Sequence, residues 1–348
     1  MTGRLSLHVL TGFLGSGKTT LLNRLLREPA LADSAILINE IGAIAIDHHL
    51  VERIDGGNAM EVVVLKGGCT CCSVRGDLIE ALRDLYVRRA QGALPAFSRA
   101  ILETTGLADP APVLFTLACD PVLRHKFEAG SVIATVDAVH CARQLQRYSE
   151  CRKQIAVSDR LMITKADIAN PSTVANLTAE LARINPAADI LDIQGVDTFG
   201  PLLGTRGFPE LCAPAVAQNM GKDLDVFANR TNHTQDVAAL ALNLHEPIEW
   251  APFSVWLSLL LHSHGENILR FKALLKVTGS SAPVWLDGVH HLVHAPIHLP
   301  AWPDGPRASR IVIIAQGFRM QRIESSLRDF LATHAARQEP AVAAMTSW

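Results

Sequence analysis

The sequence predicts an α/β protein, with a doubly wound, mainly parallel sheet covered by helices on both faces and a smaller α+β domain after it. The first observation behind this prediction is that short apolar runs alternate with helical patterns over the first half of the chain. The second is a change of character after about residue 195, where the periodicity weakens. The predicted strands of the first half are residues 6–10, 35–39, 61–65, 99–103, 131–136 and 160–164.

Leucines at helical spacing mark the predicted helices between these strands. Residues 18–27 carry leucines on one face, and residues 78–85 repeat the pattern. Ligands of such sheets bind at the carboxyl ends of the strands. We therefore expect the functional residues to follow the strands directly.

The chain divides by composition into four expected segments. Residues 1–195 form the sheet domain, and residues 196–234, rich in Gly, Pro and Asn, form a linker. Residues 235–332 form the second domain and residues 333–348 a frayed tail. Within the second domain we expect helices near residues 253–262 and 324–331 and strands near residues 284–286 and 310–315.

Composition excludes several classes of protein. Hydrophobic residues make up 49% of the chain and the formal net charge is -2, so neither disorder nor general binding to nucleic acid or an anionic membrane is expected. No apolar run approaches the roughly 20 residues of a membrane helix. The first apolar run breaks at Gly12 without a cleavage-like site, so we expect a cytoplasmic protein without a secretory leader.

Residues 12–19 fit the phosphate-binding pattern G-x-x-x-x-G-K-[ST] at every position. A strand before and a helix after the loop supply the context that a chance glycine-rich turn would lack. Lys18 would reach the β- and γ-phosphates as a catalytic cation, and the Thr19 hydroxyl would bind Mg²⁺. The nucleotide-binding residues predicted here are Gly12, Gly15, Ser16, Gly17, Lys18, Thr19 and Thr20.

Glu103 ends the fourth apolar run and is the predicted catalytic acid. Nucleotide hydrolases place an acid at the end of a neighbouring strand, where it orients the metal and its water. Gly106 could approach the terminal phosphate through its backbone N–H. Without the phosphate loop, a solvated glutamate at a strand end would be the simpler interpretation.

A third element follows the strand at residues 160–164. Thr164, Lys165 and Asp167 match the guanine-reading pattern [NT]-K-x-D, with threonine where asparagine is commoner. A carboxylate at Asp167 can accept both N1–H and N2–H of guanine, which adenine lacks. Adenine would leave a buried Asp167 unpaired, and a site of this kind discriminates between bases by about 10⁴-fold. The sequence thus predicts GTP as the nucleotide, although short T-K-x-D segments also occur by chance.

Three thiols crowd into four residues at Cys69, Cys71 and Cys72. Thiolates select soft or borderline ions such as Zn²⁺ and Co²⁺, and three ligands leave a fourth position open. We place this cluster between a strand and a helix that begins near Val74. The alternatives are an inert turn or a disulfide from Cys69 to Cys71 or Cys72. The scattered cysteines, expected to be core or incidental, are Cys119, Cys141, Cys151 and Cys212.

Together these motifs resemble the CobW family of metal-handling GTPases, over nearly the whole chain. The matching segments, in the family's order, are residues 12–20, 39–40, 69–72, 103–110, 136–138, 164–167, 253–260, 270–272 and 288–290. The resemblance implies GTP hydrolysis, a transition metal held by the cysteine cluster, and a client metalloprotein.

The chain departs from the family pattern in two places. Ala43 stands where the family often has a second glutamate after Asn39-Glu40. The linker carries only His233 in place of a histidine-rich tract. Other histidines that could bind a metal or serve as hydrogen-bonded surface groups are His48, His49, His290, His291, His294 and His298.

Three functions remain open at this point. The leading prediction is a GTP-hydrolysing chaperone that delivers zinc or cobalt to a client metalloprotein and is slow without metal or client. The alternatives are a GTP-regulated zinc-binding, storage or regulatory protein with little hydrolysis, and a nucleotide-dependent metabolic enzyme. Assembly into a homo-oligomer is left open.

Overall fold

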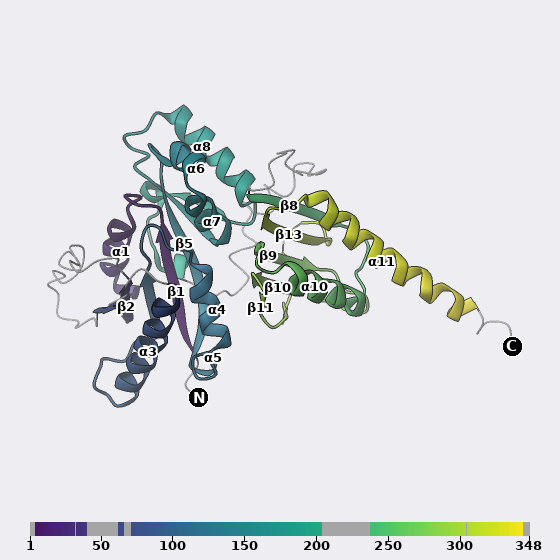
Figure 1. Cartoon of the computed structure of the whole chain (residues 1–348), viewed down its shortest axis with the longest axis horizontal. Helices are drawn as coiled ribbons and strands as arrows, with labels where there is room; N and C mark the ends of the chain where they lie inside the picture. Colours follow the sequence, from purple (N-terminus) through teal and green to yellow (C-terminus); the bar gives the residue numbers. More distant parts are fainter. Residues whose placement is uncertain are drawn as a thin grey trace. The chain divides into compact units, whose positions relative to one another are not determined.

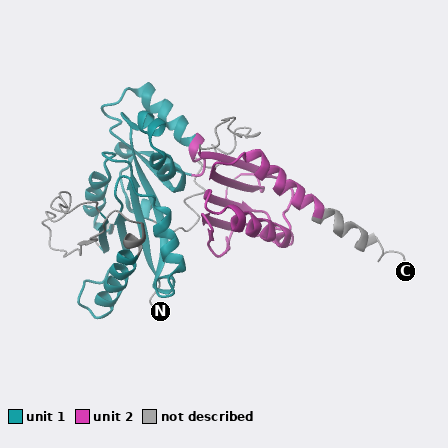
Figure 2. Cartoon of the chain, viewed as in Figure 1, with its two compact units in different colours: residues 1–182, 188–207 teal, residues 183–187, 208–348 magenta. Residues whose placement is uncertain are grey.

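The computed structural model describes residues 4–31, 33–39, 62–65, 71–203, 237–303 and 305–343, with the backbone alone at residues 30, 62–65, 71–75 and 334–343. Two compact units divide the chain, residues 1–182 with 188–207 and residues 183–187 with 208–348 (Figure 2). None of the described helices combines the length and apolar character that a bilayer crossing needs.

Unit 1 is built on a seven-stranded sheet in the order β3-β2-β4-β1-β5-β6-β7, and neighbouring strands pair in parallel. This is the doubly wound α/β architecture that the sequence predicts. Its strands are β1 (Leu5–Gly12), β2 (Ser34–Asn39), β3 (Val62–Leu65), β4 (Arg99–Glu103), β5 (Phe127–Asp137), β6 (Arg160–Thr164) and β7 (Asp189–Asp192).

Helices alternate with these strands, and Figure 1 shows α1 on one side of the sheet and α4 and α7 on the other. The helical elements are α1 (Lys18–Leu26), η1 (Pro29–Leu31), α3 (Cys71–Ala90), α4 (Ala111–Cys119), α5 (Leu123–Lys126), α6 (Cys141–Arg147), α7 (Ser149–Val157), α8 (Pro171–Ile184), η2 (Ile193–Gly195) and η3 (Gly200–Leu203).

The leucine face of α1 packs against the sheet, as its spacing predicts. Leu21, Leu22 and Leu25 are fully buried, in one cluster with Leu10 of β1 and Ile101 of β4. Burial of a leucine side chain contributes about 1.5–3 kcal/mol, so this face fixes α1 on the sheet. The loop before α1 is thereby held at the carboxyl end of β1.

Unit 2 carries a six-stranded antiparallel sheet in the order β11-β10-β9-β13-β8, with β12 paired to β10. Its strands are β8 (Val237–Leu244), β9 (Ile268–Leu275), β10 (Val284–Val289), β11 (Leu292–Val293), β12 (Ile297–His298) and β13 (Ser309–Gln316). Helices α10 (Trp250–His264) and α11 (Met320–Ala343) share one core with the sheet and are joined by a hydrogen bond from Trp256 Nε1 to Ser326 Oγ of 3.1 Å.

Several elements differ from the sequence-based expectation. The short strand β7 and the strands β8 and β9 were not predicted. β8 reads VAALALNL, so alanine and leucine point to a helix, and pairing with β13 overrides that local preference. α11 runs on to Ala343, through residues expected to be a tail, because this stretch is rich in helix formers.

A buried ion pair lies in the sheet of unit 2. Arg270 on β9 and Asp287 on β10 approach to 2.9 Å, and their side chains are 1% and 7% exposed. Removing one partner of such a pair leaves the other charge buried and uncompensated, which costs about 3–5 kcal/mol.

We expect Asp287→Asn, which keeps the side-chain shape and removes the charge, to destabilise unit 2 by about 3–5 kcal/mol. Urea unfolding followed by tryptophan fluorescence would measure this loss. Glu324→Gln is the matched control, because it breaks the pair with Arg328, whose side chain is 55% exposed, and should cost about 1 kcal/mol or less. Equal losses from the two variants would contradict the prediction.

Candidate functional site

Glycines shape the loop between β1 and α1. Gly12, Gly15 and Gly17 have φ of 136°, 72° and 93°, in the region that side chains disfavour. A Cβ on Gly12 would lie 2.6 Å from the carbonyl oxygen of Thr135. Ser16 Oγ and Thr135 Oγ1 are hydrogen-bonded at 2.6 Å, so the loop is also tied to β5.

Positive charge gathers around this loop. α1 has no acidic residue in its first turn, and a helix N-terminus attracts anions through its unpaired N–H groups. Lys18 Nζ donates to the carbonyl oxygens of Gly12 at 3.0 Å and Phe13 at 3.3 Å, which places the ammonium group over the loop. A turned glycine-rich backbone, a helix N-terminus and a lysine together suit a phosphate group.

Thr19 and Glu103 meet at the end of the sheet. The Thr19 hydroxyl donates to Glu103 Oε1 at 2.9 Å, and Glu103 is only 7% exposed. The sheet register brings this about, because Leu10 of β1 stands opposite Glu103 of β4. A hydroxyl and a carboxylate are oxygen ligands of the kind that Mg²⁺ binds, so the pair fits the metal that the sequence predicts.

The segment after Glu103 lies against the phosphate loop. Thr104 N donates to the Leu10 carbonyl at 2.9 Å, which continues the pairing with β1. A Cβ on Gly106 would come within 2.8 Å of the backbone nitrogen of Leu14. Glycine is therefore required at position 106, where its backbone packs against the phosphate loop.

The segment after β6 holds the same loop from the other side. Thr164 Oγ1 donates to the Ser16 carbonyl at 2.8 Å. Lys165, in the left-handed region with φ of 58°, donates from Nζ to the Gly15 carbonyl at 2.8 Å and to Asp137 Oδ2 at 2.6 Å. The structure thus brings two residues of the guanine-reading pattern onto the phosphate loop.

Asp137 is a site residue that the sequence did not mark, although it lies in the matching segment at residues 136–138. Its burial raises the pKa of this carboxyl, but the hydrogen bonds from Lys165 and from the backbone N–H groups of His140 and Val139 outweigh burial and leave the pKa below its usual value of 3.8. Asp137 stands opposite Thr164 in the β5–β6 register. Its position at that strand end was the available signal.

Two other predicted residues, Asp167 and Thr20, are exposed and lie at the surface near these elements. Exposure leaves the Asp167 carboxylate accessible to a ligand, which differs from the buried carboxylate that the discrimination argument assumed. A bound base would have to cover it.

The cysteine cluster lies mostly outside the described residues. α3 begins at Cys71, earlier than the expected start near Val74, so Cys71 and Cys72 belong to its first turn. Residue 69, the side chains of residues 71 and 72, and residues 40–61 fall outside what the structure describes. Among the described side chains no group of three or more His, Cys, Asp or Glu could hold a metal ion.

Two of the predicted histidines of unit 2, His290 and His291, point to backbone carbonyls. His290 Nδ1 lies 3.1 Å from the carbonyl oxygen of Glu266, and His291 Nδ1 lies 2.9 Å from that of Leu261. A carbonyl only accepts, so both Nδ1 atoms donate. Of the other cysteines in the described residues, Cys141 and Cys151 are buried in unit 1 and Cys119 is exposed.

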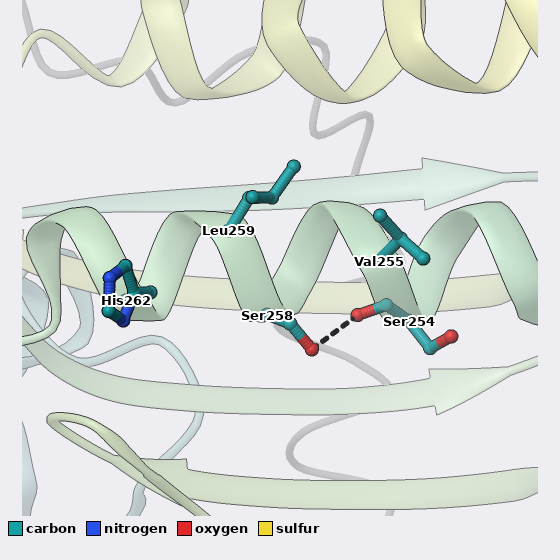
Figure 3. Close-up of a pocket in the computed structure, with 5 residues that line it drawn as sticks. All are labelled: Ser254, Val255, Ser258, Leu259 and His262. Atoms are coloured by element: carbon teal, nitrogen blue, oxygen red, sulfur yellow. Dashed lines mark hydrogen bonds between the residues drawn. The ribbon is translucent and has the colours of Figure 1, made fainter.

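A shallow pocket of about 480 Å³ lies on the outer face of α10 and contains none of the predicted site residues. Figure 3 shows its lining side chains Ser254, Val255, Ser258, Leu259 and His262, which all come from this one helix. With a single helix as its wall, the pocket offers no converging polar groups, so the strand-end loops of unit 1 remain the candidate site.

The fold and the loop at residues 12–19 define a P-loop nucleotide-binding protein. A model of the CobW/HypB/UreG nucleotide-binding domain matches residues 6–192, and a model of the cobalamin synthesis protein CobW C-terminal domain matches residues 237–331. The chain therefore belongs to the CobW/HypB/UreG family, which confirms the resemblance predicted from its motifs.

Two known relatives are similar over almost their whole length. The zinc chaperone YjiA of Escherichia coli is 32% identical, over 89% of this chain and 93% of its own. The zinc chaperone CobW of Pseudomonas aeruginosa is 27% identical, over 94% and 92%. The crystal structure of zinc-bound YjiA GTPase from E. coli has a TM-score of 0.66 at 23% identity, over 94% of this chain and 99% of that one, which shows a shared fold.

We expect Asp137→Asn to reduce the loss of stability on acidification. The lowered pKa means that the ionised carboxylate stabilises the native state above its unfolded pKa near 3.8. That contribution disappears as the pH falls through the folded value. Urea unfolding at pH 7 and at about pH 3 should show the variant less stable than wild type at pH 7, with the difference narrowing in acid.

Asp120→Asn provides a comparison at a second site. The pKa of its carboxyl is also below the usual value: burial raises this pKa, but the hydrogen bonds from the Leu123 N–H and the Arg83 guanidinium outweigh burial. The difference in stability between wild type and Asp120→Asn should also narrow in acid, and Lys165 has no part in it. If the difference in unfolding free energy between wild type and Asp137→Asn stays constant with pH, the Asp137–Lys165 pair adds no pH-dependent stability.

Proposed function

We propose that this protein binds and hydrolyses GTP and delivers a transition metal, zinc or cobalt, to a client metalloprotein. The observation that carries the proposal is the contact between the Thr19 hydroxyl and Glu103 at the end of the parallel sheet. It joins a phosphate loop to a buried acid, the pairing that nucleotide hydrolysis requires. Family membership and a 32% identical relative named as a zinc chaperone support the metal-delivery part.

The phosphates of GTP would lie in the loop at residues 12–19, against the N-terminus of α1. Lys18 would supply positive charge to the β- and γ-phosphates, and Gly106 a backbone N–H. Mg²⁺, held through Thr19, would neutralise phosphate charge when bound. Glu103 would orient the attacking water or the metal shell, because its carboxylate is already fixed by Thr19.

The guanine base would be read by the segment after β6. The Asp167 carboxylate would accept the N1–H and N2–H of guanine, and Lys165, held by Asp137 and Gly15, would place its side chain beside the base. Thr164 ties this segment to Ser16 of the phosphate loop. Base and phosphates would then be recognised by connected parts of one framework.

The transported metal would be held by Cys69, Cys71 and Cys72, whose thiolates suit zinc or cobalt. β3 ends at Leu65 and α3 begins at Cys71, so the cysteines follow a carboxyl strand end of the same parallel sheet. Nucleotide and metal sites at one edge would allow loss of the terminal phosphate to change metal affinity.

The proposal assigns a task to each segment of the chain. Residues 1–195 are the GTPase domain with the metal motif, residues 196–234 the linker, and residues 235–332 the CobW-like domain. Residues 333–348 are a tail, which α11 enters as far as Ala343. Metal-binding thiols must stay reduced, which fits the cytoplasm. The client would be a metalloprotein that accepts the ion.

Two other functions would give different results. A zinc-storage or regulatory protein would bind GTP and metal but hydrolyse no GTP even with metal and client in excess. A nucleotide-dependent metabolic enzyme would transfer phosphate to a small acceptor. Single-turnover assays with labelled GTP distinguish the three, because they reveal whether phosphate is retained, released or transferred.

We expect zinc and cobalt affinity to depend on the bound nucleotide. With GDP in place of a non-hydrolysable GTP analogue, the affinity should fall about tenfold, within the usual range of coupling between sites. Competition with a fluorescent chelator would measure it. Cys71→Ser should abolish the dependence, whereas Cys119→Ser, on the exposed end of α4, should leave it intact. Identical affinities in both nucleotide states would rule out the coupling.

Asp167→Asn should remove most of the preference for GTP over ATP. The preference expected of a paired carboxylate is about 10⁴-fold, and an amide cannot accept both guanine N–H groups. Titration with fluorescent GDP and ADP would measure it. Asp329→Asn, an exposed change on α11, serves as the control. If wild type and Asp167→Asn bind both nucleotides equally well, the guanine assignment is wrong.

A further inference from the structure

Gln154 on α7 contacts the segment that follows Glu103. Its Nε2 donates to the Gly106 carbonyl at 3.2 Å and to the Ala108 carbonyl at 3.0 Å. The side chain is buried, with 1% of the residue exposed. Because two carbonyls can only accept, the amide nitrogen must face them, which defines the orientation of the amide. One side chain thus holds two backbone carbonyls of this loop.

The loop that Gln154 holds is confined on its other side by the phosphate loop. The backbone of Gly106 lies so close to Leu14 that a Cβ would be 2.6 Å from Leu14 Cδ2. Thr104 N, two residues earlier, is bonded to the Leu10 carbonyl of β1. Gly106 has no side chain with which to anchor itself. Its position therefore depends on Leu14 from one side and Gln154 from the other.

Gln154 itself is firmly placed. Its neighbours on α7, Ile155 and Val157, are buried, and its own carbonyl accepts the Ser158 hydroxyl at 2.6 Å. The side chain also borders a very small cavity, of about 10 Å³, that reaches Gly12 of the phosphate loop. A buried hydrogen-bond donor of this kind can hold a loop in place, because its own side chain has little conformational entropy left to lose.

We propose that Gln154 is a positioning residue that holds Gly106 where its backbone can meet the terminal phosphate, and so makes the site favour GTP over GDP. This inference rests on the proposed function. The α- and β-phosphates contact the loop at residues 12–19 in both nucleotides. The γ-phosphate alone would reach Gly106, so loosening Gly106 weakens GTP binding and hydrolysis while GDP binding is unchanged.

The test is a set of full-length variants compared with wild type. Gln154→Met keeps the length and volume and removes both hydrogen bonds, and Gln154→Glu keeps the shape while turning a carboxylate toward two carbonyls. Gln144→Met is the matched control, because Gln144 on α6 borders the same cavity and no hydrogen bond joins its side chain to the loop among those described. Thermal unfolding would establish that each variant is folded.

Affinities for GDP and for a non-hydrolysable GTP analogue, both with Mg²⁺, provide the first measurement. In Gln154→Met we expect analogue affinity and the single-turnover hydrolysis rate to fall about tenfold, as for two lost hydrogen bonds. GDP affinity should stay within about twofold. Gln154→Glu should lose more, and Gln144→Met should match wild type. An equal fall for GDP and analogue would overturn the positioning role and leave only a structural one.

Hydrogen–deuterium exchange of the nucleotide-free protein tests the positioning separately from the proposed function. Backbone amides of residues 104–109 should exchange faster in Gln154→Met than in wild type or Gln144→Met, with β8 as an internal reference. Unchanged exchange would refute the inference even in a protein that hydrolyses GTP. A wild type that binds no guanine nucleotide would instead refute the proposed function, and the exchange result would still decide the role of Gln154.

Discussion

Parallel pairing of β1 with β4 and β5 is the constraint on which the whole site depends. It sets Leu10 opposite Glu103 and Gly12 opposite Thr135, so residues distant in sequence meet at one level. The Thr19–Glu103 contact follows from that register, since α1 starts directly after the loop. A shift of β4 would separate the Thr19 hydroxyl from Glu103. A shift of β5 would break the contact between Ser16 of the loop and Thr135.

A second consequence of this arrangement is that hydrogen bonds tie the segment after β6 to the loop at residues 12–19. Lys165 reaches the Gly15 carbonyl and Asp137 together, and Thr164 reaches Ser16. Lys165 adopts an unfavourable left-handed backbone, which costs of order 1–3 kcal/mol and persists because these bonds over-determine it. A left-handed lysine at this point shows that tertiary contacts, and not local preference, set the backbone of the segment after β6.

Much of this architecture could be predicted from the sequence, because the apolar runs mark the strands and the motifs directly follow the strand ends. β4 and β6 have the predicted bounds, and the motifs at residues 12–19 and 103–106 lie where alternation places them. Asp137 had a signal in its position at the end of β5, whereas the contacts of Gln154 could not be predicted, because they depend on carbonyls brought close only by the tertiary fold. β8 was missed since its alanines and leucines favour helix, and its partner β13 is remote in sequence.

The two carbonyl acceptors of Lys18 bear on how tightly a nucleotide could be retained. Its ammonium group is already satisfied by Gly12 and Phe13 before any phosphate arrives. On binding an anion, the Lys18 ammonium group would exchange carbonyl oxygens for phosphate oxygens as its hydrogen-bond acceptors. The net gain is then a difference between two comparable terms. Such a balance keeps product release within reach, which a protein that cycles between two nucleotides requires.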